Sequence, residues 1–318
     1  MPPRRVIGID AGGTNLRGGV VDQELVVHHR VHRQWHGADR RETLDIFVEA
    51  VEEVRAAATD VEAVGFGIPA LVDFEAGVAR WSTHLPLEDV PFRDLMSERL
   101  GLPVYVDNDA NVAMLAEHRH GAARDTRYAV LIALGTGIGS GLVVDGRLYR
   151  GATGLGAEIG HMVVDLHGPE CQGDCPGRGC LEVIASGTAI GVAGAEAARR
   201  EPGSALGRRL AGGGEVTGGL VTELAHDGDE LARSVLAEIG RRLGAGLTSV
   251  VNIFNPEVIV VAGGALAAGE LLLAPAREVV AARALPPARD TARIVSAHFG
   301  EESGMVGAAL LALHEGQP

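Results

Sequence analysis

Three cysteines and one histidine lie within twenty residues of one another, in the stretch EIGHMVVDLHGPECQGDCPGRGCLE. They are His161, Cys171, Cys175 and Cys180, and they include every cysteine of the chain. Three thiolates and one imidazole form the tetrahedral ligand set that a structural zinc ion prefers. The alternative is three buried free thiols, which the polar and glycine-rich residues between them disfavour. We therefore predict a structural Zn²⁺ with no open coordination position.

One carboxylate stands at each end of this cluster, Glu158 before it and Glu182 after it. A metal ion at the cysteines would fix the positions of both acids. Paired, rigidly held carboxylates are suited to hydrogen bonding with a polyhydroxylated ligand. We expect the two glutamates to contact such a ligand.

A second polar group, Asp107-Asn108-Asp109-Ala110-Asn111, follows a predicted strand and begins a predicted helix. One of the two aspartates is expected to cap the helix. Two aspartates and two asparagines in five residues exceed what capping requires. The functional interpretation makes Asp109 a general base toward a sugar hydroxyl, with Asn108 donating to a neighbouring hydroxyl. Such a base contributes a factor of about 10² to 10⁴.

Two glycine loops each follow an apolar strand, and their backbone N–H groups and threonine hydroxyls could approach phosphate oxygens. Neither has the spacing of a P-loop or a Rossmann fingerprint, and each alone would be only a tight hairpin. As a pair they predict binding of nucleotide phosphates, and Asp10 at a strand end could hold Mg²⁺ through water. The predicted nucleotide-binding residues are Asp10, Gly12, Gly13, Thr14, Asn15, Gly135, Thr136, Gly137, Gly139, Gly263 and Gly264, the last two either a turn or backbone against adenine and ribose.

Both loops occur in the same sequence pattern, which consists of an apolar strand, a Gly/Thr loop and a second strand that ends in Val-Val-Asp. We interpret this as an internal duplication with one hairpin per domain. The remaining hydrophobic periodicity alternates strands with helices, which predicts an α/β fold with mixed sheets. The spacing predicts strands at 6–9, 61–68, 102–106 and 257–262, and helices at 42–58, 110–120, 231–253 and 304–314.

The composition limits the function classes. A chain of 318 residues with 46% hydrophobic residues can form two domains, and a formal net charge of −14 disfavours nucleic-acid binding. No apolar h-region follows Arg4 and Arg5, and no segment is typical of a membrane span. An odd number of cysteines at metal-like spacing indicates a reducing, cytoplasmic location.

Taken together, these motifs resemble the ROK family of bacterial sugar kinases and repressors, over nearly the whole chain. The resemblance is carried by IDAGGTN, VDNDANVAMLAE, LGTGIGSGL, GAEIGHMVV, the cysteine loop ending in GCLE, IFNPEVIVVAGG and GMVGAALLAL. It implies the two-domain actin/hexokinase-like (ribonuclease H-like) ATPase fold, with ATP and sugar meeting in an interdomain cleft. The expected domains are residues 1–115 with 297–318, and residues 116–296.

The resemblance also implies roles for individual residues. Asp109 matches the family's catalytic aspartate, which takes the proton of a sugar hydroxyl, usually the 6-hydroxyl. The sugar-contacting positions match Asn108, Glu158, His161 and Glu182. His161 would use one ring nitrogen for zinc and the other for the sugar. The implied cofactors are ATP, Mg²⁺ and Zn²⁺, and the implied assembly is a homodimer or homotetramer.

Three departures from the family pattern concern the zinc and the sugar. The cysteines are spaced C-x3-C-x4-C, an insertion that can still close the same ring. An early sugar loop has Ala70 where the family usually has glycine. The loop Thr83-His84-Leu85 stands where related kinases often have Asn-Leu, so we expect Thr83 and His84 to contact the substrate and His84 to recognise a different hydroxyl or an amino group.

Glucose is the expected substrate by default. The alternatives are N-acetylglucosamine, N-acetylmannosamine, an amino-hexose such as kanosamine, and a cyclitol. The phosphoryl donor is ATP or polyphosphate. A sugar-responsive repressor is the alternative from a different class, disfavoured because only five residues precede the first strand and leave nothing for a helix-turn-helix. A catalytically inactive sugar-binding protein is disfavoured by the retention of Asp10, Asp109 and both glycine loops.

Overall fold

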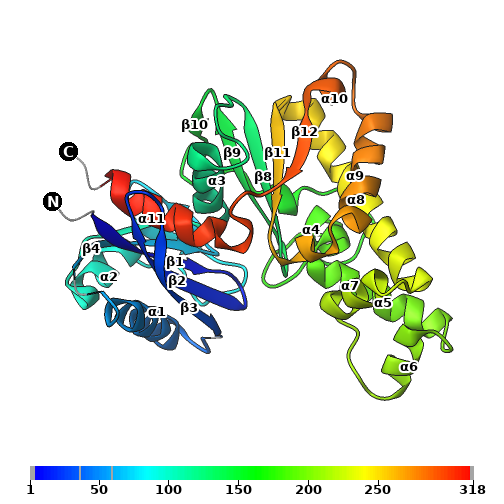
Figure 1. Cartoon of the computed structure of the whole chain (residues 1–318), viewed down its shortest axis with the longest axis horizontal. Coiled ribbons are helices and arrows are strands. Elements are labelled where there is room, and N and C mark those ends of the chain that lie inside the picture. Colours follow the sequence, from blue (N-terminus) through cyan, green and yellow to red (C-terminus); the bar gives the residue numbers. More distant parts are fainter. Residues whose placement is uncertain (1–3, 36, 59, 316–318) are drawn as a thin grey trace. The chain divides into compact units, whose positions relative to one another are not determined.

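The computed structural model describes residues 4–35, 37–58 and 60–315, and its contacts divide the chain into two compact units (Figure 1). The first unit contains Met1–Leu131, Ser140–Ala157 and Ala297–Pro318, and the second contains Ile132–Gly139 and Glu158–Ser296. This division differs from the expected boundary after residue 115, which would cut the continuous helix α3 (Asp109–His120). Strands β8 (Ala129–Leu134) and β9 (Ile138–Val144) each contribute residues to both units.

The first sheet has the order β3-β2-β1-β4-β7. An antiparallel hairpin supplies β1 and β2, with β3 beside it, while β1, β4 and β7 are parallel. The strands are β1 Arg5–Ala11, β2 Asn15–Asp22, β3 Val27–Gln34, β4 Val61–Ile68 and β7 Val104–Asn108, with a separate two-stranded sheet of β5 Leu71–Asp73 and β6 Val78–Trp81.

Helices cover both faces of this sheet. On one face α1 (Arg40–Arg55) and α2 (Phe92–Leu100) enclose an aromatic cluster in which Phe47, Phe66 and Phe92 are fully buried. On the other face lie α11 (Ser303–Glu315) and α3 (Asp109–His120), which also pack against each other (Figure 1). Side chains alternate along a strand, so β1 supplies residues to both cores.

Helix α11 lies directly against the sheet because two strands carry glycine at the contact. A Cβ at Gly65 would overlap the carbonyl of Ala308, and a Cβ at Gly8 would overlap the backbone of α11. Its start is fixed by Glu117 of α3, which is fully buried. The Glu117 carboxylate accepts hydrogen bonds from the N–H groups of His298 and Phe299 and from the hydroxyl of Ser303. The first turn of α11 is thereby held against α3.

The second sheet has the order β10-β9-β8-β11-β12. The apolar strand β11 is completely buried, and the 25-residue helix α8 packs against α4, α5, α7 and α9. The strands are β8 Ala129–Leu134, β9 Ile138–Val144, β10 Arg147–Leu148, β11 Val258–Ala262 and β12 Arg293–Ser296. The helices are α4 Leu181–Ala185, α5 Gly187–Arg200, α6 Ala205–Ala211, α7 Gly218–His226, α8 Glu230–Phe254, α9 Glu270–Arg283 and α10 Ala288–Thr291, with 3-10 turns η1 Ile159–His161, η2 Gly264–Ala268 and η3 Gly300–Glu302.

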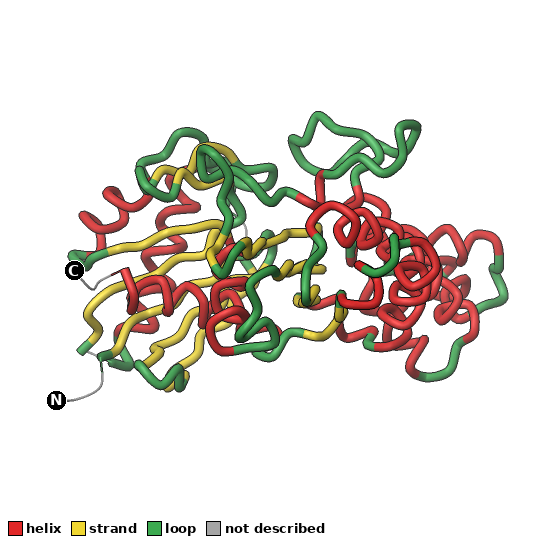
Figure 2. The backbone as a smooth tube through the Cα atoms, turned by 90° about the horizontal axis from the view of Figure 1, so that it is seen from above, coloured by secondary structure: helices red, strands yellow, loops and turns green. Residues whose placement is uncertain are grey.

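All eight elements predicted from periodicity are present, with ends shifted by up to three residues. Helix α1 begins two residues before its predicted start because Asp39 caps it, accepting from the N–H of Glu42. The segment between β10 and α4, which carries the cysteines, is loop apart from the 3-10 turn η1, and Figure 2 shows the loops of the chain in green. Of the helices formed by residues 4–35, 37–58 and 60–315, none combines the length and apolar character that a membrane crossing needs.

Candidate functional site

The polar residues of the first unit gather where three parallel strands end. Asp10 of β1 is in register with Gly67 of β4, and Gly67 is in register with Asp107 of β7. Asn108 and Asp109 follow at once. Ligands of open α/β sheets bind at this carboxyl edge. Residues almost a hundred positions apart in the sequence are therefore brought to one edge.

The cap of helix α3 is Asn108, which corrects the expectation that an aspartate caps it. The Asn108 side-chain oxygen accepts from the N–H groups of Ala110 and Asn111, at 2.9 and 3.2 Å. Its side-chain amide donates to the carbonyl of Ala70 at 3.3 Å. Asparagine offers both an acceptor and donors, so one side chain fixes the helix start and the neighbouring loop. Asp109 is the first residue of the helix, and its Oδ1 also accepts from the N–H of Ala110 at 2.8 Å.

Asp10 and Asp109 form an unneutralised pair of carboxyl groups. Burial raises the pKa of Asp109 to about 7. Burial, followed by the charge of Asp109, raises the pKa of Asp10 to about 7, while Arg17 acts in the opposite direction. A Cβ at Gly304 of α11 would overlap the Asp10 carboxyl, so glycine is required to admit it. A hard cation such as Mg²⁺ binds carboxylate oxygens and would offset the repulsion between these two groups.

Asp107 is held by Arg150, which belongs to none of the sequence motifs. Its side chain is 1% exposed, and its Oδ2 accepts from Nε of Arg150 at 2.8 Å and forms an ion pair with Nη2 at 2.8 Å. Its Oδ1 accepts from the N–H of Asn108 and the side-chain amide of Asn111. The Arg150 guanidinium also lies 3.7 Å from the ring centroid of Phe74. Arg150 stands in an unremarkable segment 43 residues away, and only the structure identifies it.

The first glycine loop, residues 12–15, turns its carbonyl groups inward. Gly12 and Thr14 carbonyls accept from the side chain and the backbone N–H of Trp35, at 3.1 and 3.2 Å. Within the part of the chain that the structure describes, the N–H groups of Gly13 and Thr14 donate to no protein acceptor. A Cβ at Gly13 would meet nothing within 4 Å, and its φ is ordinary, so the fold itself does not require glycine there. The N–H groups of Gly13 and Thr14 and the empty space beside Gly13 would allow a phosphate oxygen to approach the backbone.

The second glycine loop, residues 135–139, repeats this arrangement in the other unit. The carbonyl of Gly135 accepts from the N–H of Gly187, and that of Thr136 accepts from the hydroxyl of Thr188 at 2.7 Å. Among the described residues nothing accepts from the N–H groups of Thr136 and Gly137. A Cβ at Gly135 would also meet nothing within 4 Å. Each unit therefore presents one loop with free amides.

Glu182 connects this loop to the cysteines. It is 4% exposed, and its Oε2 accepts from the N–H of Ile138 at 2.9 Å, while Oε1 lies 3.6 Å from the sulfur of Cys171. A Cβ at Gly137 would overlap this carboxylate, so that glycine has a structural reason. Glu158 is exposed at the start of the 3-10 turn that carries His161. The two glutamates expected to contact one ligand thus have different surroundings.

The predicted zinc ligands come together in the second unit. The ligand atoms of His161, Cys171, Cys175 and Cys180 all lie within 4.8 Å of one another. The sulfurs of a tetrahedral zinc site with bonds of 2.3 Å are roughly 3.8 Å apart, so small movements would close the shell. His161 presents Nδ1 to Cys171, at 3.7 Å. Burial and the other thiols raise the pKa of Cys171, and a zinc ion would reverse this shift.

The loop of residues 82–85, which we name the 82–85 loop, is joined to the strand end that carries Asn108. The hydroxyl of Ser82 donates to the carbonyl of Pro69 at 2.6 Å and accepts from the N–H of His84 at 3.2 Å. Asn108 binds the next carbonyl, that of Ala70. Thr83 and His84 are half-buried, and their contact with a substrate stays a prediction.

Gly263 and Gly264 follow β11 as expected. Gly263 has a φ of 92°, and a Cβ there would overlap the backbone of Leu134. The backbone and the packing therefore both require Gly263, whatever it binds. Gly264 opens the turn η2, and its contact with adenine and ribose remains a prediction.

Comparisons with known proteins bear on the family and the fold of the chain. The model described as ROK family matches residues 6–315. The chain is 36% identical over 313 residues to a glucokinase of Thermotoga maritima, with 97% of each chain covered. It resembles a ROK family glucokinase from Streptomyces griseus in complex with glucose and AMPPNP, with a TM-score of 0.89 at 33% identity over 97% of this chain and 99% of that one. A ROK family transcriptional regulator, a homolog of the E. coli MLC protein, has a TM-score of 0.85 at 28% identity, over 98% and 78%. The fold is thus the expected two-domain actin/hexokinase-like fold.

Proposed function

Because this chain belongs to the ROK family, we propose that it transfers the γ-phosphoryl group of ATP to the 6-hydroxyl of glucose, with Asp109 as the general base. It is a sugar kinase by its likeness to glucokinases in sequence and structure. The observation that carries the assignment of the base is the pairing of Asp10 and Asp109 at the carboxyl edge of a parallel sheet, each with a pKa of about 7.

The two aspartates have separate roles in this proposal. Asp109 takes the proton of the sugar hydroxyl as that oxygen bonds to the γ-phosphorus and the bond to the departing ADP breaks. A base whose pKa is near the working pH is best matched to this transfer. Asp10 holds Mg²⁺, directly or through water, which neutralises charge on the phosphates when it is bound.

The glycine loops hold the phosphates. Gly13, Thr14, Thr136 and Gly137 offer N–H groups that no described protein acceptor uses. Phosphoryl transfer depends on positioning and charge neutralisation, so fixed amide donors contribute in both ways. Gly263 and Gly264 are assigned to the adenosine part of the donor. Inorganic polyphosphate is the alternative donor, as in the named polyphosphate/ATP-glucomannokinase from Arthrobacter, which is 26% identical.

The sugar is held by Asn108, Glu158, His161 and Glu182, with Thr83 and His84 beside it. His161 presents Nδ1 to Cys171, so a zinc ion held by the cysteines would bind that nitrogen, and Nε2 would be left for a sugar hydroxyl. Glucose is favoured because several similar relatives are named glucokinase. N-acetylglucosamine, N-acetylmannosamine, an amino-hexose such as kanosamine and a cyclitol are the alternatives. We propose a homodimer or homotetramer, free of nucleic acid and membrane, in the cytoplasm.

A sugar-responsive regulator is the second candidate, favoured by the likeness to the transcriptional regulator. A regulator needs to bind sugar without consuming ATP, so turnover separates the two. The deciding experiment offers hexoses, hexosamines and cyclitols with Mg·ATP or Mg·polyphosphate and measures the ADP or phosphorylated product formed. Phosphorus NMR of the product identifies the modified hydroxyl. Sugar binding without turnover on every substrate would contradict the kinase assignment.

A further inference from the structure

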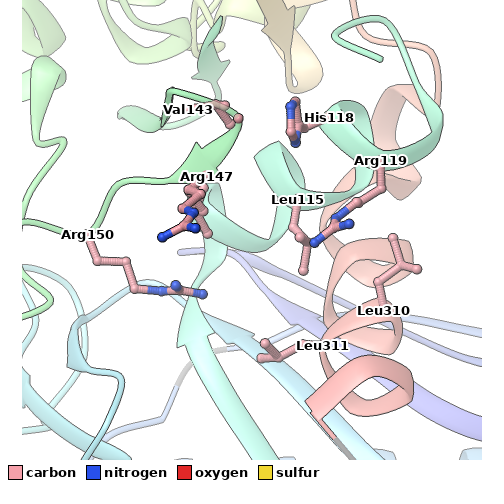
Figure 3. Close-up of a pocket in the computed structure, with 10 residues that line it drawn as sticks. Leu115, His118, Arg119, Val143, Arg147, Arg150, Leu310 and Leu311 are labelled. Carbon is pink, nitrogen blue, oxygen red and sulfur yellow. The ribbon is translucent and has the colours of Figure 1, made fainter. Parts of the chain in front are cut away.

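A separate pocket lies in the first unit, between helix α3, the hairpin of β9 and β10, and helix α11 (Figure 3). Its volume is about 310 Å³, which is at the lower end of the range for small-molecule sites. We call it the basic pocket. Its lining residues are Leu115, His118, Arg119, Val143, Gly146, Arg147, Leu148, Arg150, Leu310 and Leu311.

The lining combines apolar walls with three guanidinium groups and no carboxylate. Leucines from α3, β10 and α11 form the apolar part. Figure 3 shows the guanidinium groups of Arg119 and Arg147 on the two sides of Leu115, with that of Arg150 beyond Arg147. None of the ten lining residues is acidic, although the chain has a formal net charge of −14. A basic cavity on an acidic protein concentrates anions.

The charge balance of the basic pocket leaves two positive charges. Arg150 is matched by Asp107. Arg119 and Arg147 have no ion-pair or hydrogen-bond partner within residues 4–35, 37–58 and 60–315, whereas most other arginines do. His118 is engaged with the carbonyl of Thr126 at 2.9 Å. One dianion would neutralise the two unmatched charges of Arg119 and Arg147.

The three arginines indicate which kind of dianion the basic pocket would bind. All 28 basic residues of the chain are arginine, and three of them meet here. A guanidinium group can donate two parallel hydrogen bonds to two oxygens of one phosphate, whereas the ammonium group of a lysine acts as a point charge. A phosphomonoester carries close to two negative charges at neutral pH and exposes three acceptor oxygens. The leucine walls would face the organic part of such an ester.

We propose that the basic pocket binds a small phosphorylated metabolite, with the phosphate on Arg119, Arg147 and the free Nη1 of Arg150. Because Arg150 also holds Asp107, one side chain joins this pocket to the strand end that carries Asn108 and Asp109. The inference concerns binding and does not depend on the proposed kinase activity.

The test is calorimetric titration with phenyl phosphate and with inorganic phosphate, at low salt and without Mg²⁺. We expect one saturable site per chain, tighter for phenyl phosphate because its ring contacts the leucines, and weaker as salt rises. The double variant Arg119→Gln/Arg147→Gln should weaken binding at least tenfold. The matched control is Arg199→Gln/Arg200→Gln, two exposed arginines at the end of α5 that also have no partner among the described residues.

Saturating ADP distinguishes the basic pocket from the glycine loops. Binding of phenyl phosphate that persists in ADP and is lost only in the Arg119/Arg147 variant supports the proposal. Absence of saturable binding, an unchanged dissociation constant in that variant, or displacement by ADP would overturn it. Thermal melting of both double variants checks that they fold, and two single variants, Arg119→Gln and Arg147→Gln, replace the double variant if it does not.

Discussion

The guanidinium of Arg150 holds the carboxylate of Asp107 at 2.8 Å through two nitrogens, in a nearly solvent-free position. The next two residues of the chain are Asn108 and Asp109. Asp107 also accepts from the N–H of Asn108, so the ion pair fixes the peptide that leads into the proposed base. Arg150 is a positioning residue in this arrangement.

We predict that Arg150→Gln destabilises the fold by about 3 kcal/mol, because it leaves a buried carboxylate without its partner. Burial already raises the pKa of Asp107 and Arg150 opposes this, so the pKa rises further in the variant. An acid with a raised folded-state pKa loses stability as pH increases, so the loss should be larger at pH 8 than at pH 5. Urea unfolding at both pH values measures it.

The matched control is Arg127→Gln, whose partner Asp145 is 61% exposed and whose own side chain is 70% exposed. Exposed pairs contribute about 0 to 1 kcal/mol, so this variant should melt almost like the wild type. The double variant Asp107→Asn/Arg150→Gln should recover part of the lost stability. Equal stability of Arg150→Gln and Arg127→Gln would show that the Asp107 pair has no special role.

Asp109→Asn should abolish phosphorylation while changing the affinity for the sugar by less than about tenfold. The amide keeps the size of the side chain but cannot accept the hydroxyl proton, and the loss of a general base lowers the rate by about 10² to 10⁴ or more. Coupled ADP assays and sugar titration by calorimetry give the two quantities. A variant with full activity would show that another group is the base.

Short sequence motifs were sufficient to predict much of the fold and to propose the residues of the candidate site. Strand and glycine patterns predicted both hairpins, and the cysteine spacing predicted a cluster that the structure brings together. The contacts that position these residues come from distant segments. Arg150 binds Asp107 from 43 residues away, and Glu117 accepts from His298 from 181 residues away. No local periodicity reports such pairs.

Capping shows a different limit of sequence reasoning. Aspartate and asparagine are both good N-cap residues, so the motif alone could not show which of them caps α3. The loop carbonyl of Ala70 selected Asn108, because only an amide can donate to it while accepting from the helix. Likewise, the glycines at 13 and 137 look alike in sequence. The fold requires only Gly137, to admit Glu182, and Gly13 is left for a ligand.

Asp10→Asn should stabilise the metal-free protein at pH 8 while removing activity. The pKa of Asp10 is raised from 3.8 to about 7, so its ionisation opposes folding as pH rises through this window. Asparagine does not ionise, and we expect a gain of about 2 kcal/mol at pH 8 and little change at pH 4, after allowance for partial solvent access. Denaturant titrations at both pH values measure this.

Magnesium provides the control for this prediction. Mg²⁺ should raise the melting temperature of the wild type at pH 8, since a cation offsets the paired carboxylates of Asp10 and Asp109. The same concentration should have a much smaller effect on Asp10→Asn. If the variant were less stable than the wild type at pH 8, the Asp10 carboxylate would not be under electrostatic strain.

The cysteine cluster should hold about one zinc ion per chain, measured by elemental analysis of protein purified without chelator. Removal of the metal should lower the melting temperature and weaken ADP binding, because Glu182 joins Cys171 to the N–H of Ile138 in the second glycine loop. Cys180→Ser should show both effects, since Cys180 is the buried ligand. Metal-free protein with unchanged melting and ADP affinity would remove the zinc assignment.

His84 should determine which sugar is preferred. It lies two residues after Ser82, whose hydroxyl donates to the carbonyl of Pro69, and the side-chain amide of Asn108 donates to the carbonyl of Ala70. The 82–85 loop and Asn108 are therefore held by two neighbouring residues. The donor and acceptor nitrogens of a neutral imidazole lie on opposite sides of a ring, whereas the oxygen and nitrogen of an asparagine amide lie side by side. The two side chains therefore pair with different substrate groups, and an unpaired polar group at such a site strongly disfavours the wrong substrate. We expect His84→Asn to change the ratio of kcat/KM between glucose and an amino-hexose by at least tenfold.

The matched control is His29→Asn, which replaces a half-buried histidine of β3 and should leave the ratio unchanged. An equal ratio in wild type and His84→Asn would mean that this side chain does not read the substrate, and the preference would then be assigned to Glu158 and His161.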